Sequence, residues 1–430
     1  MADRSIPPKI QPIEAFPLPT PRREPLQNGI SVFHFDNPNL DLIHLLVQVR
    51  TGSFYQPAKH VCHFTYLLLK ESSPRLSSQE TAEKLDYYGT AVSVTVGLTR
   101  VQIMISMPKS NLADILPIIA EFLITPIFRA ENLRIMQDKE LKNLAYNTQK
   151  TDYRSWQLMW HEMLGEALPA VSEIASPETI NALSTKQLQD FHKESFCAEN
   201  VSVFATGNTD SATERLIAET FSAVPRGVPS PELPLIPVRS TTERTVYQPM
   251  EGCLQSSIIL CSLSTGYNHP DRTAFSVLNT LTGGYFSSRL MQNLRERQGL
   301  TYGISSASTY FGEQSIFAIS SDVNADQTAH AIDSCFEELQ RLQEEPVSDQ
   351  ELDMVKNYLA GIQLRAADTT VNAMQKYALF HLFGLDETEL YRYLIDIKKV
   401  TAEGILNLSK KYFSHNKFTQ IIVGKYLSDK

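Results

Sequence analysis

Short runs that alternate between hydrophobic and polar residues, or that are continuously hydrophobic, predict the strands of this chain. GISVFHFD (29–36) and LDLIHLLVQVRTGS (40–53) are the first two such runs. Both contain many β-branched and aromatic residues, which favour strands. A helix is expected to begin within residues 63–70. The pattern therefore opens with two strands followed by a helix.

The same order of elements occurs twice. Residues 78–106 and 288–320 each predict a helix, a glycine-containing turn and two strands joined by a further turn. In each half, two helices with apolar residues at helical spacing follow. Each half then ends on a β-rich run that reaches a glycine, NVSVFATGN (200–208) and FTQIIVGK (418–425). Repetition of a whole series of elements indicates a duplicated unit.

A proline-rich segment divides the chain almost in half. Five prolines occur within positions 225–237, and proline interrupts helices and favours an extended chain. We therefore predict an N-terminal domain at 26–222, a linker at 223–240 and a C-terminal domain at 241–430. The fold class is α+β, because each domain is expected to be a mainly antiparallel sheet covered by helices.

Composition and charge narrow the classes of partner. The 430 residues carry a net charge of −9, which opposes binding to nucleic acid because phosphate contacts need clustered Lys and Arg. No stretch has the apolar length of a membrane span or the apolar core of a signal peptide. The five cysteines are scattered and odd in number, which predicts reduced thiols. We expect no nucleic acid partner, no membrane contact and a cytoplasmic location.

Four motifs together give the chain a family resemblance. They are RTGSFYQP, CHFTYLLLKES, SSRLMQNLRERQGLTYGISS and VSDQELDMVKNYLAG. With them the chain resembles the pitrilysin/insulinase family of inverted-motif zinc peptidases, and in particular its short two-domain members, which work as paired subunits like the mitochondrial processing peptidase. The similarity extends from Leu26 to Gly424. It implies two homologous domains that face each other as a clamshell.

The zinc-binding motif of this family is degenerate here. The family helix carries H-x-x-E-H, in which two histidines bind zinc and the glutamate accepts a proton from the zinc-bound water. His63 takes the first position, but Tyr66 replaces the glutamate and Leu67 replaces the second histidine. The second-helix glutamate falls around Asn143, where no carboxylate stands, although Glu140 is close enough to leave a gap in register open.

A different metal site remains a weaker alternative. His60, Cys62 and His63 are neighbours in sequence, but adjacent helical residues diverge by about 100°. The plainer interpretation of His63 is a packed or hydrogen-bonded helix residue. We therefore expect no cofactor and no metal in this chain.

The C-terminal half keeps a pair of residues to which the resemblance assigns a function. Arg295 and Tyr302 occupy the positions of an Arg-Tyr pair that reaches toward the zinc site of a facing half or subunit. Gly299 is expected to cap the intervening helix, so that the two side chains converge across the turn. The alternative is a surface arginine and a strand tyrosine without a catalytic role.

Two further features each have two interpretations. Gly283 and Gly284 are either a flexible substrate-contacting loop or a helix end followed by an N-cap at Ser287 or Ser288. Trp156 and Trp160, four residues apart, are either a peptide-binding wall or, as we prefer, part of a helical core.

The asymmetry of the two halves gives the functional hypothesis. A chain without zinc ligands that retains Arg295 and Tyr302 is expected to be a subunit of a two-subunit metallopeptidase. The expected partner is a homologous subunit with an intact motif, which holds the zinc; a homodimer is a further assembly to consider. The substrate is a peptide. The rival hypothesis is a non-enzymatic scaffold or peptide-binding homologue.

Overall fold

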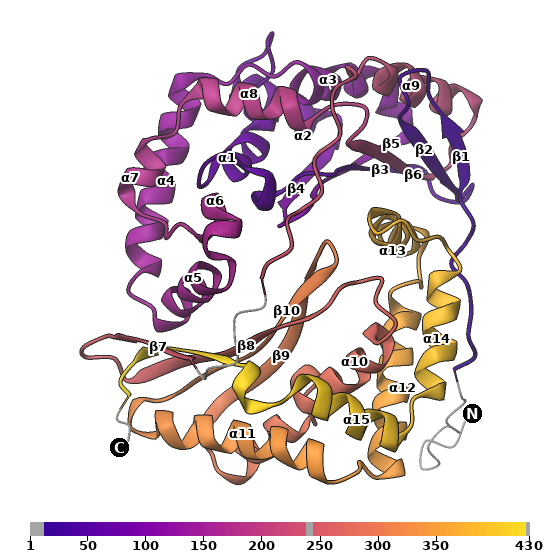
Figure 1. The fold of residues 1–430 in the computed structure, drawn as a ribbon. Coiled ribbons are helices and arrows are strands. Elements are labelled where there is room, and N and C mark those ends of the chain that lie inside the picture. The colour runs from indigo at the N-terminus through magenta and orange to yellow at the C-terminus, as the bar shows by residue number, and fades with distance from the viewer. Residues whose placement is uncertain (1–12, 238–243, 427–430) are drawn as a thin grey trace, which may run out of the picture.

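The computed structural model describes residues 13–237 and 244–426. Each half of the chain builds one sheet with its own layer of helices, and the two domains face each other as a clamshell (Figure 1). The predicted α+β fold is therefore confirmed. Among the described residues, no helix is both long and apolar enough to cross a bilayer.

The N-terminal half contains six strands and nine α-helices within the described residues, in the order β1 (Arg22–Pro25), β2 (Ser31–Asp36), β3 (Leu42–Val49), α1 (Val61–Leu67), α2 (Ser78–Tyr87), β4 (Ala91–Val96), β5 (Val101–Pro108), α3 (Leu112–Ile124), α4 (Ala130–Asn147), α5 (Thr151–Leu164), α6 (Pro169–Ser172), α7 (Pro177–Asn181), α8 (Thr185–Ser195), β6 (Val201–Gly207) and α9 (Ser211–Ser222). Short 3-10 turns lie between them: η1 (Ser53–Tyr55), η2 (Leu69–Glu71), η3 (Lys109–Asn111) and η4 (Gly165–Ala167).

The C-terminal half contains β7 (Arg244–Pro249), β8 (Gln255–Thr265), α10 (Arg272–Asn279), the π-helical turns η5 (Thr280–Gly284) and η6 (Met291–Arg297), β9 (Thr301–Phe311), β10 (Gln314–Asn324), η7 (Ala325–Gln327), α11 (Thr328–Glu344), α12 (Asp349–Arg365), α13 (Thr370–Leu382), α14 (Glu389–Lys399), α15 (Ala402–Tyr412), η8 (His415–Lys417) and β11 (Thr419–Gly424).

The strand order shows the duplication directly. The first sheet has the order β1-β2-β6-β3-β5-β4 and the second has the order β7-β11-β8-β10-β9. From β2 onward the two orders correspond strand for strand in chain sequence, with β1 as an addition at one edge. Each sheet is mainly antiparallel, as predicted, and each contains one parallel pair, β2 with β6 and β7 with β11.

Alternation along β4 and β5 distinguishes the helix-covered face of the first sheet from the face toward the other domain. In β5, buried Val101, Ile103 and Ile105 alternate with half-buried Gln102 and Met104. The buried set belongs to the hydrophobic core under the helices of that domain. On the opposite face, Gln102 and Met104 line a cavity between the domains. The aromatic residues of β2 and β6 on this face are buried against the other domain.

The two domains hold each other by reciprocal helix contacts. In α5 of the first domain, Met159 packs with Ile259 of the second sheet. Helix α13 of the second domain lies against the first sheet (Figure 1). In this contact, Tyr377 packs with Phe33 at a ring distance of 5.4 Å. Both helices occupy equivalent places in the duplicated unit, so two equivalent helix–sheet contacts join the domains.

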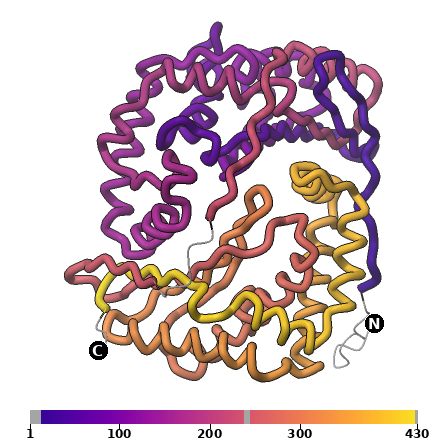
Figure 2. The backbone as a smooth tube through the Cα atoms, viewed as in Figure 1, coloured from indigo at the N-terminus to yellow at the C-terminus, as the bar shows by residue number. Residues whose placement is uncertain are grey.

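The proline-rich segment crosses between the domains, as the tube in Figure 2 shows. Residues 223–237, within the predicted linker, have no helix or strand. Positions 238–240 of that linker lie outside the described residues. The domain boundaries at 26–222 and 241–430 stay predictions.

Candidate functional site

The degenerate zinc helix is α1, a helix of seven residues that follows the end of β3. His63 is half-buried on it, Tyr66 is fully buried and Leu67 is half-buried. His60 lies at the N-cap with φ 70°, and it is the one non-glycine residue with positive φ among those described. A left-handed conformation costs a residue with a Cβ atom about 1–2 kcal/mol, so α1 begins on a strained histidine.

Tyr66, at the glutamate position, is hydrogen-bonded into the protein core. Its hydroxyl lies 2.8 Å from Ser195 Oγ, and Ser195 donates its own proton to the carbonyl of Phe191 at 2.6 Å. Tyr66 is therefore the donor to Ser195, because a serine hydroxyl has one proton. Burial raises the pKa of Tyr66 well above its usual value. A buried phenol that keeps its proton cannot act as a general base.

The first helix of the motif faces one carboxylate of α4. The charge of Glu140 acts on both His60 and His63, and Asn143 donates a hydrogen bond of 3.1 Å to Glu140. Glu140, rather than a group at Asn143, is thus the carboxylate beside the histidines. Burial lowers the pKa of His63, and burial together with Lys59 lowers the pKa of His60 to about 4.

Zinc is the metal that the resemblance implies, and the residues present do not fit it. A zinc site needs about three donor side chains. Leu67 has no donor atom, and Tyr66 is bonded to Ser195. Within the described part of the chain, no three His, Cys, Asp or Glu side chains are grouped so as to hold a metal ion. The alternative set that includes Cys62 fails on chemistry too, because burial raises the pKa of this thiol and disfavours the thiolate.

Arg295 and Tyr302 lie on either side of one tight turn. Arg295 is in the last turn of η6, and Tyr302 is the second residue of β9. Gly299 between them has φ 64°, and the next residue closes the helix with a 2.8 Å hydrogen bond from Leu300 N to the carbonyl of Leu294. This is the predicted glycine cap. The convergence of the two side chains across this turn stays a prediction.

The surroundings of the pair are open. The side chain of Tyr302 is 90% exposed, at the start of the edge strand β9. Arg295 lies over the exposed ring of Phe286, at 4.7 Å from its centroid. The other end of β9 contacts the N-terminal domain, where Phe311 meets Phe54 at 5.2 Å. Tyr302 and Phe311 are nine steps apart along the strand, about 30 Å, so the pair is remote from that contact.

The glycine pair before Arg295 has a third explanation. Gly283 is buried in η5, and a Cβ atom there would lie 2.7 Å from Ser306 Oγ. Close packing against β9 therefore requires glycine, and the predicted flexible loop is not needed to explain it. The helix begins at Arg289, and the carbonyl of Ser288 accepts a 2.9 Å hydrogen bond from Gln292 N, so Ser288 occupies the predicted N-cap position. Its Oγ is buried without a partner, so the side chain makes no capping hydrogen bond.

The two tryptophans of α5 differ from each other. Trp160 packs against the hydrophobic cluster between the domains and meets Phe54 edge-on at 6.3 Å. Trp156 is 39% exposed, so core packing describes it poorly. The sequence analysis also missed Phe286 and Ser195, since a lone exposed phenylalanine and a lone helical serine give no local signal.

Comparison with known proteins agrees with this geometry. Residues 182–359 match the protein-family model described as "Peptidase M16 inactive domain". The chain is 22% identical over 428 residues to an uncharacterized zinc protease of Mycobacterium bovis, covering 97% of this chain and 96% of that one.

Solved structures share the fold over almost the whole chain. A peptidase M16 inactive domain from Pseudomonas fluorescens superposes with a TM-score of 0.86 at 20% identity, covering 95% of this chain and 99% of that one. A protease from Helicobacter pylori superposes with a TM-score of 0.82 at 16% identity, covering 94% and 99%.

Proposed function

We propose that this chain, which belongs to the M16 (pitrilysin-type) family of peptidases, is the zinc-less subunit of a two-subunit metallopeptidase. In this proposal it supplies Arg295 and Tyr302 to the zinc site of a homologous partner with an intact H-x-x-E-H motif. The partner binds the zinc and this chain completes the site.

One contrast carries the proposal. The residue that replaces the catalytic glutamate, Tyr66, is fully buried and bonded to Ser195, whereas Tyr302 is 90% exposed at an open sheet edge. Within the described residues, Tyr302 makes no side-chain hydrogen bond and no ring contact. A second chain is what could use such a group.

The two side chains suit the chemistry that the proposal assigns to them. A guanidinium and a phenolic hydroxyl both donate hydrogen bonds, and such donors stabilise the negative oxygen that develops when a peptide carbonyl is attacked. Each donor typically contributes a few kcal/mol to the transition state. Neither residue needs to change its protonation state to do so.

The substrate in this proposal is a peptide in extended form. An extended peptide can add to a sheet edge through main-chain hydrogen bonds, and β4 and β9 are the edge strands next to the space between the domains. We further propose a cytoplasmic location, because all five cysteines are free thiols. Cell fractionation tests the location.

Mixing with the partner tests the function. The purified chain, the intact-motif homologue and their equimolar mixture are assayed with a quenched fluorescent peptide, and complex formation is followed by sedimentation. We expect the mixture to exceed the summed rates of the separate chains. A complex that forms and is no faster than the partner alone would contradict the proposal.

The alternative function is a peptide-holding scaffold, and one contact favours it. The stack of Arg295 on Phe286 gives the arginine a structural role that needs no partner. Peptide binding by a stable complex that shows no added activity would support this alternative.

A further inference from the structure

A cavity of about 640 Å³ lies between the two domains. One wall is the inner face of the first sheet, with Ser93 and Thr95 of β4 and Arg100 at the start of β5. The other wall is the end of α12 and the exposed side of α13, with Arg365 and Lys376. The cavity is therefore bounded by β4, the edge strand of that sheet.

The charge of this cavity is opposite to that of the whole chain. Three cations, Arg100, Arg365 and Lys376, line it, and no Asp or Glu is among its lining residues, although the chain carries a net charge of −9. Within the described residues, none of the three side chains makes a hydrogen bond or an ion pair. Cations that share a cavity repel each other, and an anion placed between them would relieve this repulsion.

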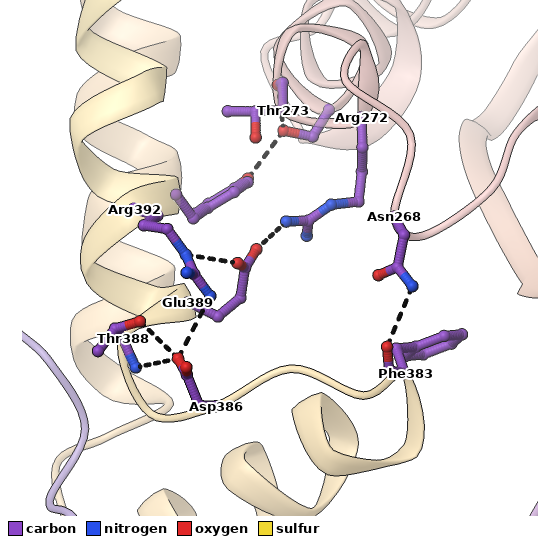
Figure 3. Close-up of polar contacts among 10 residues, drawn as sticks. Asn268, Arg272, Thr273, Phe383, Asp386, Thr388, Glu389 and Arg392 are labelled. Atoms are coloured by element: carbon purple, nitrogen blue, oxygen red, sulfur yellow. Dashed lines mark hydrogen bonds and ion pairs between the residues drawn. The ribbon is translucent and has the colours of Figure 1, made fainter.

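The carboxylate whose charge acts on Lys376 is already bound elsewhere. Glu389 of α14 forms an ion pair with Arg272 of α10 and accepts a 3.3 Å hydrogen bond from Arg392 (Figure 3). Two guanidinium groups thus compensate Glu389, and it does not neutralise Lys376. Burial, and then the charge of Arg272, lowers the pKa of Lys376 to about 8, and Glu389 offsets this in part.

The strand next to the cavity determines what kind of anion can reach it. Along β4, Ala91, Ser93 and Thr95 are exposed while the valines between them are half-buried. A peptide that adds to this edge would lie about 5 Å from β4, and its alternate side chains would point to the same face as Ser93 and Thr95. One of those side chains, or the chain end, would then enter the cavity.

We propose that the cavity between Arg100, Arg365 and Lys376 is a carboxylate-binding subsite that selects acidic peptides. This inference rests on the proposed peptide-binding function and names its substrate class. The carboxylate is either an Asp or Glu side chain or the peptide's own C-terminus. Both would accept charge-assisted hydrogen bonds from the two guanidinium groups and the ammonium.

Peptide binding to the full-length chain alone tests the subsite. Fluorescence anisotropy compares a labelled extended peptide that contains one central Glu with its Gln version, each with a free and an amidated C-terminus. We expect loss of the recognised carboxylate to weaken binding about ten- to a hundredfold. Whether substitution or amidation causes the loss distinguishes the side chain from the C-terminus.

Variants of two of the lining cations provide a second test of the subsite. Arg365→Gln, at an exposed position, and Lys376→Gln should each weaken binding of the acidic peptide and leave binding of the neutral peptide unchanged. Lys356→Gln, on the same helix as Arg365 and outside the cavity, is the matched control. Equal affinity for acidic and neutral peptides, no detectable binding, or an equal loss in the control would overturn the inference.

This experiment is independent of catalysis. Carboxylate-dependent binding without any activity in the mixed complex would contradict the proposed catalytic role and leave the subsite intact. Activity of the mixed complex without any charge preference would do the reverse.

Discussion

The hydroxyl of Tyr66 lies 2.8 Å from Ser195 Oγ, so α1 is fastened to α8 at the position where an active relative would have its general base. The bond connects a fully buried side chain to a helix that begins more than a hundred residues later. Ser195 in turn donates its hydroxyl proton to the carbonyl of Phe191. Tyr66 therefore has a structural role, because it joins two helices through a buried hydrogen bond.

Removal of this hydroxyl should cost stability. We expect Tyr66→Phe to lower the free energy of unfolding by about 0.5–1.5 kcal/mol, the usual contribution of one buried hydrogen bond. Urea denaturation followed by circular dichroism measures it. Tyr87→Phe, at a residue that is 83% exposed, is the control and should be neutral. An unchanged midpoint for Tyr66→Phe would mean that the bond contributes nothing.

Restoring the residues of the H-x-x-E-H motif by substitution should not restore a zinc site. In the double variant Tyr66→Glu/Leu67→His, the new carboxylate would replace a side chain with no exposed surface, and an unpaired buried charge destabilises a protein by several kcal/mol. We expect elemental analysis to find no stoichiometric zinc in the wild-type chain, and the double variant to unfold at lower temperature. One tightly bound zinc per wild-type chain, with chelator-sensitive peptide hydrolysis, would refute our reading of the site.

The sequence was informative where local pattern decides structure. Alternation predicted β5, the repeated order of elements predicted two matching sheets, and Gly299 was correctly placed as a helix cap. Prediction from the sequence failed where a contact joins residues that are far apart in the chain. The Tyr66–Ser195 bond spans 129 positions, and the steric need for Gly283 comes from Ser306 on another element.

The structure also decides which residue of α4 lies beside the two histidines of the motif region, a point that the motif spacing left open. The carboxylate of α4 that acts on His60 and His63 is Glu140. Counting along the chain pointed instead to the positions around Asn143. Glu140 and Asn143 lie three residues apart and are hydrogen-bonded, so they share one face of α4. Sequence distance alone cannot show which turn of this face lies beside the histidines.

Acid should weaken the fold in a defined window. Burial lowers the pKa of both His60 and His192 to about 4, against an ordinary value of 6.5. The folded state therefore binds these protons less well than the unfolded state. Stability is full above pH 6.5 and falls as the pH drops toward 4. Thermal unfolding measured from pH 7 to pH 4 should show this decline.

A single substitution shows how much of this acid-dependent loss of stability comes from His60. His60→Gly removes the titrating group and also relieves the left-handed strain at φ 70°, so we expect a gain of about 0.5–1 kcal/mol at pH 7 after the entropic cost of glycine. Its decline toward pH 4 should be smaller than that of the wild type. A loss of stability at pH 7 would show that the imidazole ring contributes more than its backbone costs.

Alkaline pH should have the opposite effect through Lys376. Its pKa is about 8 in the folded state against 10.5 ordinarily, so the unfolded state holds more protons between these values and stability rises with pH across that window. Lys376→Met should raise the melting temperature at pH 7, and its advantage should vanish by pH 10.5. Lys356→Met on α12 is the control, with no expected pH-dependent difference. Destabilisation by Lys376→Met at pH 7 would contradict the prediction.

Arg295 and Tyr302 should matter for catalysis in the complex and little for the fold. Tyr302 is exposed and Arg295 contacts the exposed ring of Phe286, so truncation leaves no buried cavity. In the mixed complex, we expect Arg295→Ala and Tyr302→Phe each to lower kcat about ten- to a thousandfold, because donors to a developing oxyanion act in the transition state. Sedimentation should show unchanged assembly, which distinguishes lost chemistry from lost binding. Arg297→Ala and Tyr87→Phe remove the same chemical groups nearby and elsewhere on the surface, and should leave kcat unchanged. If the complex keeps full activity without both Arg295 and Tyr302, the pair is structural, and the peptide-holding scaffold becomes the better account of this chain.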